Sequence, residues 1–285
     1  MPNVELRSYR RVAIVGVGLI GGSIGLGLLS RKIACSVVGI GRSPDRLKMA
    51  VDVGAITEFS TDIDAVSDAD IVVICTPVNS IADFVVSVAK LAPEHVLITD
   101  GGSTKRTIVE DVESRLAERN VFVGSHPMAG SEKTGVEFAE SDLYENRDVI
   151  LTPTAQTDVS RVDQCRRFWE SLGANVRTMS PGEHDDVVSS ISHAPHVVAA
   201  ILSASTPDSH LSLASTGWCD TTRIAAGDVM MWEQIVQQNK SSVQKSLQHF
   251  QAVLQQFTDA LASDDFESVR KLLAKGKSKR DAVAS

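Results

Sequence analysis

The fold is decided by the stretch VAIVGVGLIGGSIGLGLL, residues 12–29, in which four apolar residues precede a segment with glycine at six of its first twelve positions. Glycine inside a strand or helix costs roughly 0.5–1 kcal/mol relative to alanine, so this cluster indicates that another group approaches the backbone closely. Gly16, Gly18 and Gly21 form the pattern G-x-G-x-x-G between a predicted strand and a predicted helix. This arrangement is typical of a turn that binds the pyrophosphate of a dinucleotide at a helix N-terminus; a glycine-rich turn without a ligand is the alternative.

Short β-branched segments alternate with helical patterns from Arg11 to about Met179. The strand-like segments are RVAIV, SVVGI, IVVIC, HVLIT, NVFVG, DVILT and NVRTM. Strands that are apolar along their whole length are typical of sheets covered on both faces, which predicts a doubly wound, mostly parallel sheet of the Rossmann type. After MSPGEHDD only helical patterns follow. We therefore expect a dinucleotide-binding domain over residues 1–180 and an all-α substrate-binding and dimerisation domain over 181–285.

Composition excludes several classes of protein. The chain has 285 residues, 43% of them hydrophobic, and a formal net charge of −8, whereas nucleic-acid-binding proteins usually present a basic face. Its start lacks an apolar signal core, and no run of about eighteen apolar residues that could cross a membrane is found, so we expect a cytoplasmic protein. The four cysteines are far apart and contain no C-x-x-C pair, which argues against a zinc site or a disulfide framework.

The end of the second predicted strand, in GIGRSPDRL, lacks the acidic residue that binds the ribose hydroxyls in a typical NAD site. Arg42 and Ser43 occupy this place, just before a helix that Pro44 begins. A guanidinium, a hydroxyl and a helix N-terminus suit the additional phosphate of NADP. The sequence thus predicts NADP as the cofactor; the alternative is that Arg42 covers the adenine and NAD is bound.

Polar residues follow three further predicted strands, at the edge where open α/β sheets bind their ligands. Thr76 and Pro77 follow IVVIC, and Ser103 lies in DGGSTK after HVLIT. His126, in SHPMAGSE, directly follows NVFVG. An imidazole, with an ordinary pKa of about 6.5, is placed there to exchange a proton beside the cofactor; a structural histidine is the alternative. The expected cofactor-binding residues are Gly16, Gly18, Leu19, Ile20, Gly21, Arg42, Ser43, Thr76, Pro77 and Ser103.

The segment from Ser241 to Ala262 has more apolar residues at helical spacing than a lone pair of helices could hide. Association with a second copy would cover them, so the sequence predicts a homodimer. These residues are Val243, Leu247, Phe250, Val253, Leu254, Phe257 and Leu261.

Six blocks of sequence, GVGLIGGS, DGGSTK, SHPMAGSE, LYEN, SHAPH and TTRIA with MW, resemble the prephenate/arogenate dehydrogenase family of tyrosine biosynthesis. They occur in the family's order between Val12 and Trp232 and cover both predicted domains. The resemblance implies an oxidative decarboxylation in which a ring carbon gives a hydride to the nicotinamide and the ring carboxylate leaves as carbon dioxide. We expect prephenate dehydrogenase activity, which yields 4-hydroxyphenylpyruvate, with arogenate dehydrogenase, which yields tyrosine directly, as the close variant.

The same resemblance implies roles for single residues. His126 accepts the proton of the substrate's ring hydroxyl as the hydride leaves, and Ser103 supports that hydroxyl. His196 contacts the substrate, and Ser192 lies near the nicotinamide. Arg223 binds the side-chain carboxylate, which suits a guanidinium; without the resemblance it would be interpreted as part of a surface ion pair. The expected substrate-binding residues are Ser192, His193, His196, Asp220, Arg223 and Trp232.

Other interpretations stay open from the residues themselves. His193 and His196 have a spacing that a metal site could use, although no carboxylate or cysteine partner is evident. A dehydrogenase of the 3-hydroxyacid class would need a G-x-x-x-K block, which is not found between Ser180 and Gln238. A dinucleotide-binding sensor without catalytic activity would leave the polar loops without a function. An acidic residue near Arg223 would favour arogenate over prephenate, because arogenate has an ammonium group where prephenate has a keto oxygen.

Overall fold

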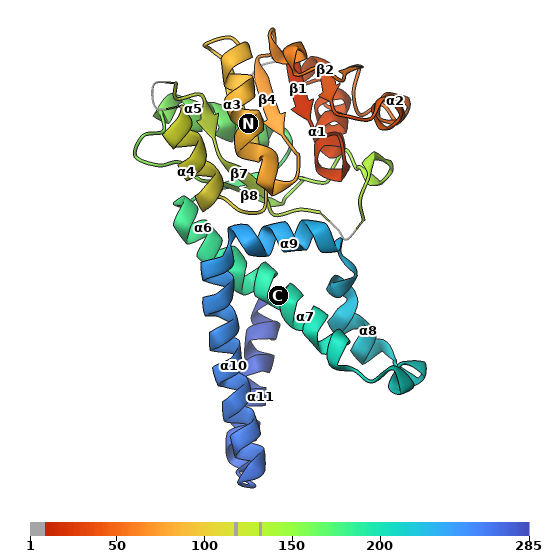
Figure 1. The fold of residues 1–285 in the computed structure, drawn as a ribbon, viewed down its shortest axis with the longest axis vertical. Helices are drawn as coiled ribbons and strands as arrows, with labels where there is room; N and C mark the ends of the chain where they lie inside the picture. Colours follow the sequence, from red (N-terminus) through yellow and green to blue (C-terminus); the bar gives the residue numbers. More distant parts are fainter. Residues whose placement is uncertain (1–8, 117–118, 131–132, 285) are drawn as a thin grey trace, which may run out of the picture. The chain divides into compact units, whose positions relative to one another are not determined.

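The computed structural model describes residues 9–116, 119–130 and 133–284. Six strands form a parallel sheet in the order β3-β2-β1-β4-β5-β6, which reverses direction between β1 and β4 as in a doubly wound fold (Figure 1). The strands are β1 (Tyr9–Val15), β2 (Ala34–Ile40), β3 (Glu58–Ser60), β4 (Ile71–Ile74), β5 (Leu97–Asp100) and β6 (Phe122–Val123). The predicted parallel Rossmann-type sheet is thus confirmed, with β3 as an additional edge strand.

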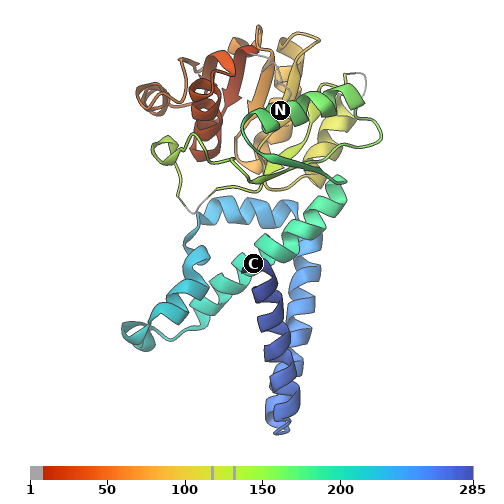
Figure 2. The ribbon, with the colours of Figure 1, turned by 180° about the vertical axis from the view of Figure 1, so that it is seen from behind.

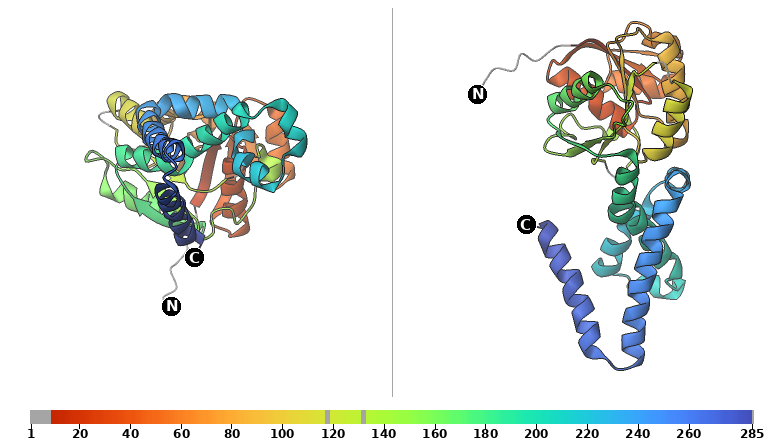
Figure 3. Two further views of the ribbon diagram at one scale, coloured as in Figure 1. Left: turned by 90° about the horizontal axis from the view of Figure 1, so that it is seen from below. Right: turned by 90° about the vertical axis from the view of Figure 1, so that its left-hand side faces the viewer.

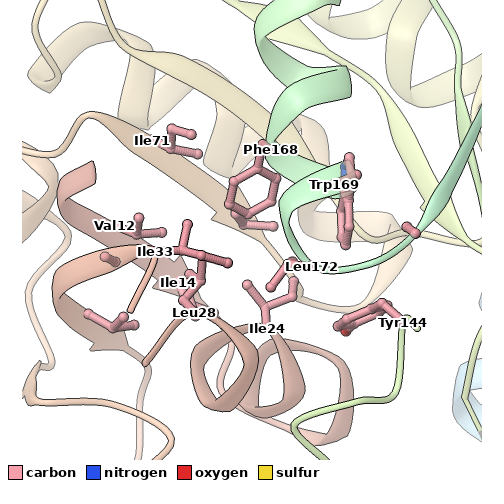
Figure 4. Close-up of a cluster of buried hydrophobic side chains, with 14 of the residues drawn as sticks. Val12, Ile14, Ile24, Leu28, Ile33, Ile71, Tyr144, Phe168, Trp169 and Leu172 are labelled. Atoms are coloured by element: carbon pink, nitrogen blue, oxygen red, sulfur yellow. The ribbon is translucent and has the colours of Figure 1, made fainter. Parts of the chain in front are cut away.

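Helices cover both faces of this sheet, because successive strand residues point to opposite sides. Val12 and Ile14 of β1 face one apolar cluster, whereas Ala13 and Val15 face the other. Figure 4 shows the first cluster, in which Phe168 and Trp169 pack near the β1 residues. Figure 1 shows α3 and α4 on the near face, and Figure 2 shows α5 from behind. The helices are α1 (Leu19–Ser30), α2 (Pro44–Asp52), α3 (Val78–Leu91), α4 (Arg106–Arg115) and α5 (Val159–Ser171).

Two of the predicted strands, in DVILT and NVRTM, do not extend the main sheet as expected, and a third strand that the sequence did not predict joins them. Strand β7 (Ser125–Pro127) pairs antiparallel with β8 (Asp148–Leu151), which in turn pairs parallel with β9 (Asn175–Thr178). His126 is therefore the central residue of a strand, opposite Ile150, and does not simply follow one. The three residues of β7 include a proline, so no alternating pattern could predict this strand.

The glycines of the first turn and helix have two structural uses. Gly16 has a positive φ of 94°, and a Cβ there would lie 2.7 Å from the Cys75 carbonyl oxygen. Gly22 and Gly27 instead allow close packing on α1, since Cβ atoms there would lie 2.8 Å from Val136 and 2.9 Å from Leu172. Tyr144 donates a hydrogen bond of 2.6 Å to the Ile20 carbonyl at the start of α1. Some glycines of the cluster are therefore needed for packing within the protein and not for binding a ligand.

A continuous helical stretch, residues 181–205, starts the region in which the described residues form no further strand. Its central segment, Ser189–His193, has the wider hydrogen-bond pattern of a π-helix, a feature frequent at functional sites. The remaining elements are helical. They are α6 (Pro181–Val188), α7 (Ala194–Ser205), α8 (Thr216–Thr222), a short turn of helix (Arg223–Ala226), α9 (Val229–Gln238), α10 (Lys240–Ala262) and α11 (Phe266–Ala284).

This stretch bears on the expectation that no segment of the chain could cross a membrane. Among the described residues, the helix over residues 181–205 is long and apolar enough to cross a membrane by length and composition alone. It also contains His184, Asp185 and His193, which are buried and hydrogen-bonded within the protein. Buried polar side chains with partners on neighbouring elements are typical of a helix in a protein core.

The chain divides into two compact units, Met1–Asn239 and Lys240–Ser285. The second unit consists of α10 and α11, a helical hairpin whose two helices meet near their connecting turn and diverge away from it (Figure 3). In the first unit, α6 packs on α4 and α9 packs on α3, so the helices from α6 to α9 share a unit with the sheet. The domain boundary at residue 180 stays a prediction.

Candidate active site

The glycine-rich turn leaves open space where a dinucleotide would approach. A Cβ at Gly18 would meet nothing within 4 Å. Gly18 is also the N-cap of α1, and since glycine has no side chain, no side chain at this position caps the first N–H groups of the helix. The backbone N–H groups at this helix end are therefore free to bind an anion. At the end of the neighbouring strand β4, the buried Oγ1 of Thr76 has no hydrogen-bond partner within the protein, so it too can serve a ligand. Leu19, Ile20, Gly21 and Pro77 belong to the same two turns.

The residues after β2 lie as the sequence predicted. Arg42 is exposed, and no hydrogen bond or ion pair within the described residues involves it. Ser43 is the N-cap of α2 and accepts a long hydrogen bond, 3.5 Å, from the Arg46 N–H. A free guanidinium beside a helix N-terminus is a suitable place for a phosphate.

The loop after β5 is fixed by a fully buried ion pair between Asp100 and Lys105. Asp100 also accepts hydrogen bonds of 2.9 Å from the backbone N–H groups of Gly102 and Ser125. These contacts join the end of β5 to the start of β7, and a buried network with every member paired is rigid. Ser103 lies inside this loop and is partly exposed, so a rigid support presents its hydroxyl.

His126 lies at one end of a chain of hydrogen-bonded side chains. Its Nδ1 atom is 2.8 Å from Nε2 of His184, and Nδ1 of His184 is 2.8 Å from Oδ1 of Asp185. His126 is half-buried, whereas His184 and Asp185 are buried. His126 comes from β7 and its two partners come from α6. These hydrogen bonds therefore join the sheet region to the helical region.

Burial controls the protonation of the two histidines, His126 and His184. It lowers the pKa of His126 well below the usual 6.5, and the charges of His184, Lys105 and His193 lower it further. Burial also lowers the pKa of His184, although the hydrogen bond to Asp185 opposes this. The imidazole of His126 is thus uncharged at neutral pH, and the expectation of a pKa near 6.5 is corrected.

A stacked aromatic pair forms a second part of the site. The rings of His196 on α7 and Trp232 on α9 lie 3.5 Å apart between centroids and are nearly parallel, at 11°. A Cβ at Gly227 would lie 2.5 Å from Trp232 Nε1 and 3.2 Å from His196, so only glycine fits there. Nδ1 of His196 is buried without a hydrogen-bond partner. A ligand atom is the natural partner for such a nitrogen.

The other predicted substrate residues differ in exposure. Asp220 on α8 and Arg223 after it are exposed, and the helical turn that contains Arg223 packs on α7. Ser192 is half-buried in the π-helical segment. His193 is almost fully buried, contacts Trp232 edge-on at 6.0 Å, and shares a hydrogen bond of 3.1 Å with Asn239. His193 is therefore a buried neighbour of Trp232 in the stacked pair.

Sequence reasoning missed two polar residues of the site, His184 and Asp185. They lie in the GEHDD segment, which separated the two predicted domains, and no spacing relates them to His126, 58 positions earlier. A histidine and an aspartate at the start of a predicted apolar helix were the only available signal. Ser131 and Glu132 of the SHPMAGSE block lie outside the described residues. Within the described ranges, no group of three or more His, Cys, Asp and Glu side chains could hold a metal ion.

A dinucleotide-binding sheet, a half-buried, uncharged histidine and a helical second region together are typical of a dinucleotide-dependent dehydrogenase. Family models for "Prephenate dehydrogenase, nucleotide-binding domain" and "Prephenate dehydrogenase, dimerization domain" match residues 24–178 and 180–275. The Bacillus subtilis prephenate dehydrogenase is 35% identical over 280 residues, which cover 95% of this chain and 76% of the relative. The chain therefore belongs to the prephenate dehydrogenase family and is an oxidoreductase.

Solved structures agree with this assignment. Aquifex aeolicus prephenate dehydrogenase, in complex with hydroxyphenyl propionate and NAD⁺, has a TM-score of 0.90 and 37% identity, covering 97% of this chain and 99% of that one. Synechocystis arogenate dehydrogenase has a TM-score of 0.81 and 29% identity, covering 96% and 99% of the two chains. The expected fold class and the expected enzyme class are thus confirmed.

Proposed function

We propose that this enzyme converts prephenate to 4-hydroxyphenylpyruvate and carbon dioxide in tyrosine biosynthesis, with His126 as the general base. The observation that carries the proposal is the half-buried, uncharged imidazole of His126, on β7 beside the rigid loop that contains Ser103. The family assignment and the similarity to the Bacillus subtilis prephenate dehydrogenase support the substrate.

The nicotinamide, when bound, accepts the hydride from the ring carbon that has the hydroxyl group. His126 accepts the hydroxyl proton as the hydride leaves, and Ser103 orients the same hydroxyl. The electrons of the bond to the ring carboxylate then enter the ring as carbon dioxide leaves, and the ring oxygen takes back a proton from His126 to give the aromatic hydroxyl group. At the other end of the substrate, the Arg223 guanidinium binds the side-chain carboxylate, and the stacked pair of His196 and Trp232 contacts the ring.

NADP is the cofactor that we propose. The exposed Arg42 after β2, where an acidic residue would bind the ribose hydroxyls of NAD, supports this choice. Substitution Arg42→Asp should shift the ratio of kcat/KM values toward NAD. If the native enzyme has the higher kcat/KM with NAD, and the substitution changes neither value, Arg42 does not determine the cofactor.

A homodimer in the cytoplasm is the assembly that we propose. In the α10–α11 hairpin, Phe250, Leu254 and Leu261 are exposed although they are large and apolar, and so are Phe266 and Leu273 on α11. A second copy would cover this surface, as the family name of the matched dimerization domain suggests. Light scattering tests this: a species of the chain mass, 30.5 kDa, that persists at micromolar concentration would contradict it.

Initial rates with prephenate and with arogenate, each against NADP and NAD, test the proposed reaction. We expect the highest kcat/KM with prephenate and NADP. A higher value with arogenate would make the enzyme an arogenate dehydrogenase; Asp220, three residues before Arg223, would then be the first candidate for binding the ammonium group. Absence of cofactor reduction with both substrates would contradict the proposed function.

A further inference from the structure

We propose that Asp185, acting through His184, holds His126 in the tautomer whose Nε2 atom can accept a proton, and that the same carboxylate fixes the loop containing Ser103. Asp185 is thus a positioning residue: it orients both the base, His126, and the loop that contains the Ser103 hydroxyl. This inference rests on the proposed role of His126 as the general base. It concerns residues that no sequence pattern links to the reaction.

The first step concerns Asp185 itself. Its Oδ1 accepts the Lys105 N–H at 2.8 Å, and its Oδ2 accepts the Arg106 N–H at 3.0 Å. Burial raises the pKa of Asp185, but hydrogen bonds from His184 and the two backbone N–H groups outweigh burial, so the net pKa is lowered. The carboxylate is ionised and can only accept hydrogen bonds, so Nδ1 of His184 must carry the hydrogen in their 2.8 Å contact.

The second step follows the proton along the chain. His184 is uncharged at neutral pH because burial lowers its pKa. A neutral imidazole has one N–H group, and since that group is at Nδ1, Nε2 of His184 is an acceptor. The 2.8 Å contact with His126 therefore needs a hydrogen on Nδ1 of His126. Nε2 of His126 is left with its lone pair, which is the form a general base requires.

The third step is the second use of the Asp185 carboxylate. The N–H groups of Lys105 and Arg106 lie at the start of helix α4, two and three residues after Ser103. The side chain of Lys105 pairs with Asp100, which also accepts the backbone N–H of Ser125, the residue before His126. Asp185, on α6, thus holds the start of α4 next to the Ser103 loop. Lys105 and Asp100 link this same region to the strand that contains His126.

The groups around His126 define how its protonation responds to pH. His184 on α6, His193 in the π-helical segment and Lys105 at the start of α4 all act on it electrostatically. Asp100 is paired with Lys105, and Asp185 lies beyond His184. If Asp185 lost its charge, His184 could take the other tautomer and donate to Nδ1 of His126, which would place the hydrogen of His126 on Nε2 and remove the base.

The direct test is to measure the tautomer in the unaltered enzyme. With ¹⁵N-histidine labelling, NMR distinguishes a protonated ring nitrogen from an unprotonated one, and a His126→Asn variant assigns the signals. We expect hydrogen on Nδ1 and none on Nε2 at pH 7.5, without substrate. Hydrogen on Nε2 of His126 would overturn the proposal. Because no substrate is present, this result does not depend on whether prephenate or arogenate is the substrate.

Variants test the consequence for catalysis. Asp185→Asn should lower kcat by at least about 10²-fold, as expected when a base takes the wrong tautomer, and should move the ¹⁵N signal of His126. Asp186→Asn is the matched control, since Asp186 is a more exposed neighbour with the same charge, and its oxygen lies 3.9 Å from the Arg106 guanidinium. The control should keep native kcat. An Asp185→Asn enzyme that is folded by circular dichroism and keeps native kcat and tautomer would also overturn the proposal.

A pair of substitutions at His184 separates positioning from packing. The amide of His184→Gln reaches the place of Nε2, beside His126, whereas the amide of His184→Asn reaches only the place of Nδ1, beside Asp185. We expect the glutamine variant to retain at least tenfold more kcat than the asparagine variant, with similar KM values. Equal kcat in the two folded variants would contradict a role through the His126 contact.

Discussion

The two ends of the site are built in opposite ways. Around His126 the polar groups are paired within the protein: His126 with His184, His184 with Asp185, and Lys105 with Asp100. At the end where the substrate carboxylate is expected, Nδ1 of His196 has no partner and Arg223 is exposed.

This contrast separates chemistry from recognition. Groups that move a proton act best when their hydrogen bonds are in place before the substrate arrives, because no reorganisation is then needed in the reaction. Groups that bind a charged substrate can stay exposed to solvent until the ligand arrives. Substitutions at the paired end should therefore change kcat or stability, and those at the open end should change KM.

The largest expected effect is that of replacing the proposed base. His126→Asn should lower kcat by about 10²–10⁴-fold, the usual contribution of general base catalysis, while KM changes little because asparagine can still form a hydrogen bond. The native kcat should fall on the acid side with an apparent pKa below 6.5, since burial keeps imidazole uncharged. The measurement is the pH profile of kcat for both proteins. A variant with the native acid limb would show that another residue is the base, and His196→Asn would be tested next.

The buried ion pair should dominate stability at the paired end. Lys105→Met leaves the Asp100 carboxylate buried without its cation and should reduce the free energy of unfolding by about 3–5 kcal/mol. Chemical denaturation measures this loss. The double variant Lys105→Met/Asp100→Asn should recover part of it, because no unpaired charge is left. If both variants lose the same stability, the charge pairing is not the cause.

Acid should destabilise the protein through the buried histidines. Burial lowers the pKa values of His126, His184 and His196, and lowers that of His193 to about 4. The unfolded chain then binds more protons than the folded one between pH 6.5 and 4, so stability is full above pH 6.5 and is lost as pH falls through this window. Each pKa unit corresponds to about 1.4 kcal/mol. A Tm that stays constant from pH 7 to pH 5 would contradict this.

The smallest expected effect is at the open end. Arg223→Ala should weaken substrate binding by roughly 1.5–3 kcal/mol, the value of a hydrogen bond to a charged group, which is about ten- to hundredfold in KM. The KM for the cofactor should not change. Arg223→Lys keeps the charge without the bidentate geometry. Its KM for the substrate should lie between those of the native enzyme and Arg223→Ala. An unchanged KM for prephenate in Arg223→Ala would remove Arg223 from this role.

The sequence predicted features that depend on neighbouring residues along the chain. The G-x-G-x-x-G turn and the strands of the parallel sheet each have a local pattern, and the structure contains them at the predicted places. The short strand β7 and the pairing of His126 with His184 depend instead on how distant segments pack. No local rule could therefore indicate that Asp185, 59 positions after His126, belongs to the same site.

The π-helical segment Ser189–His193 shows that the length of a segment can matter more than its composition. His184 and His196 are twelve residues apart, and in a regular α-helix their directions would differ by about 120°. The wider turn accommodates one additional residue, which reduces this angle to about 20° and presents both rings to nearly the same side. A one-residue deletion here would rotate everything before it against everything after it, although no side chain of the site would be altered. The number of residues between His184 and His196 thus sets the relative direction of the two rings. That number has to be preserved when the protein is shortened, recombined or grafted.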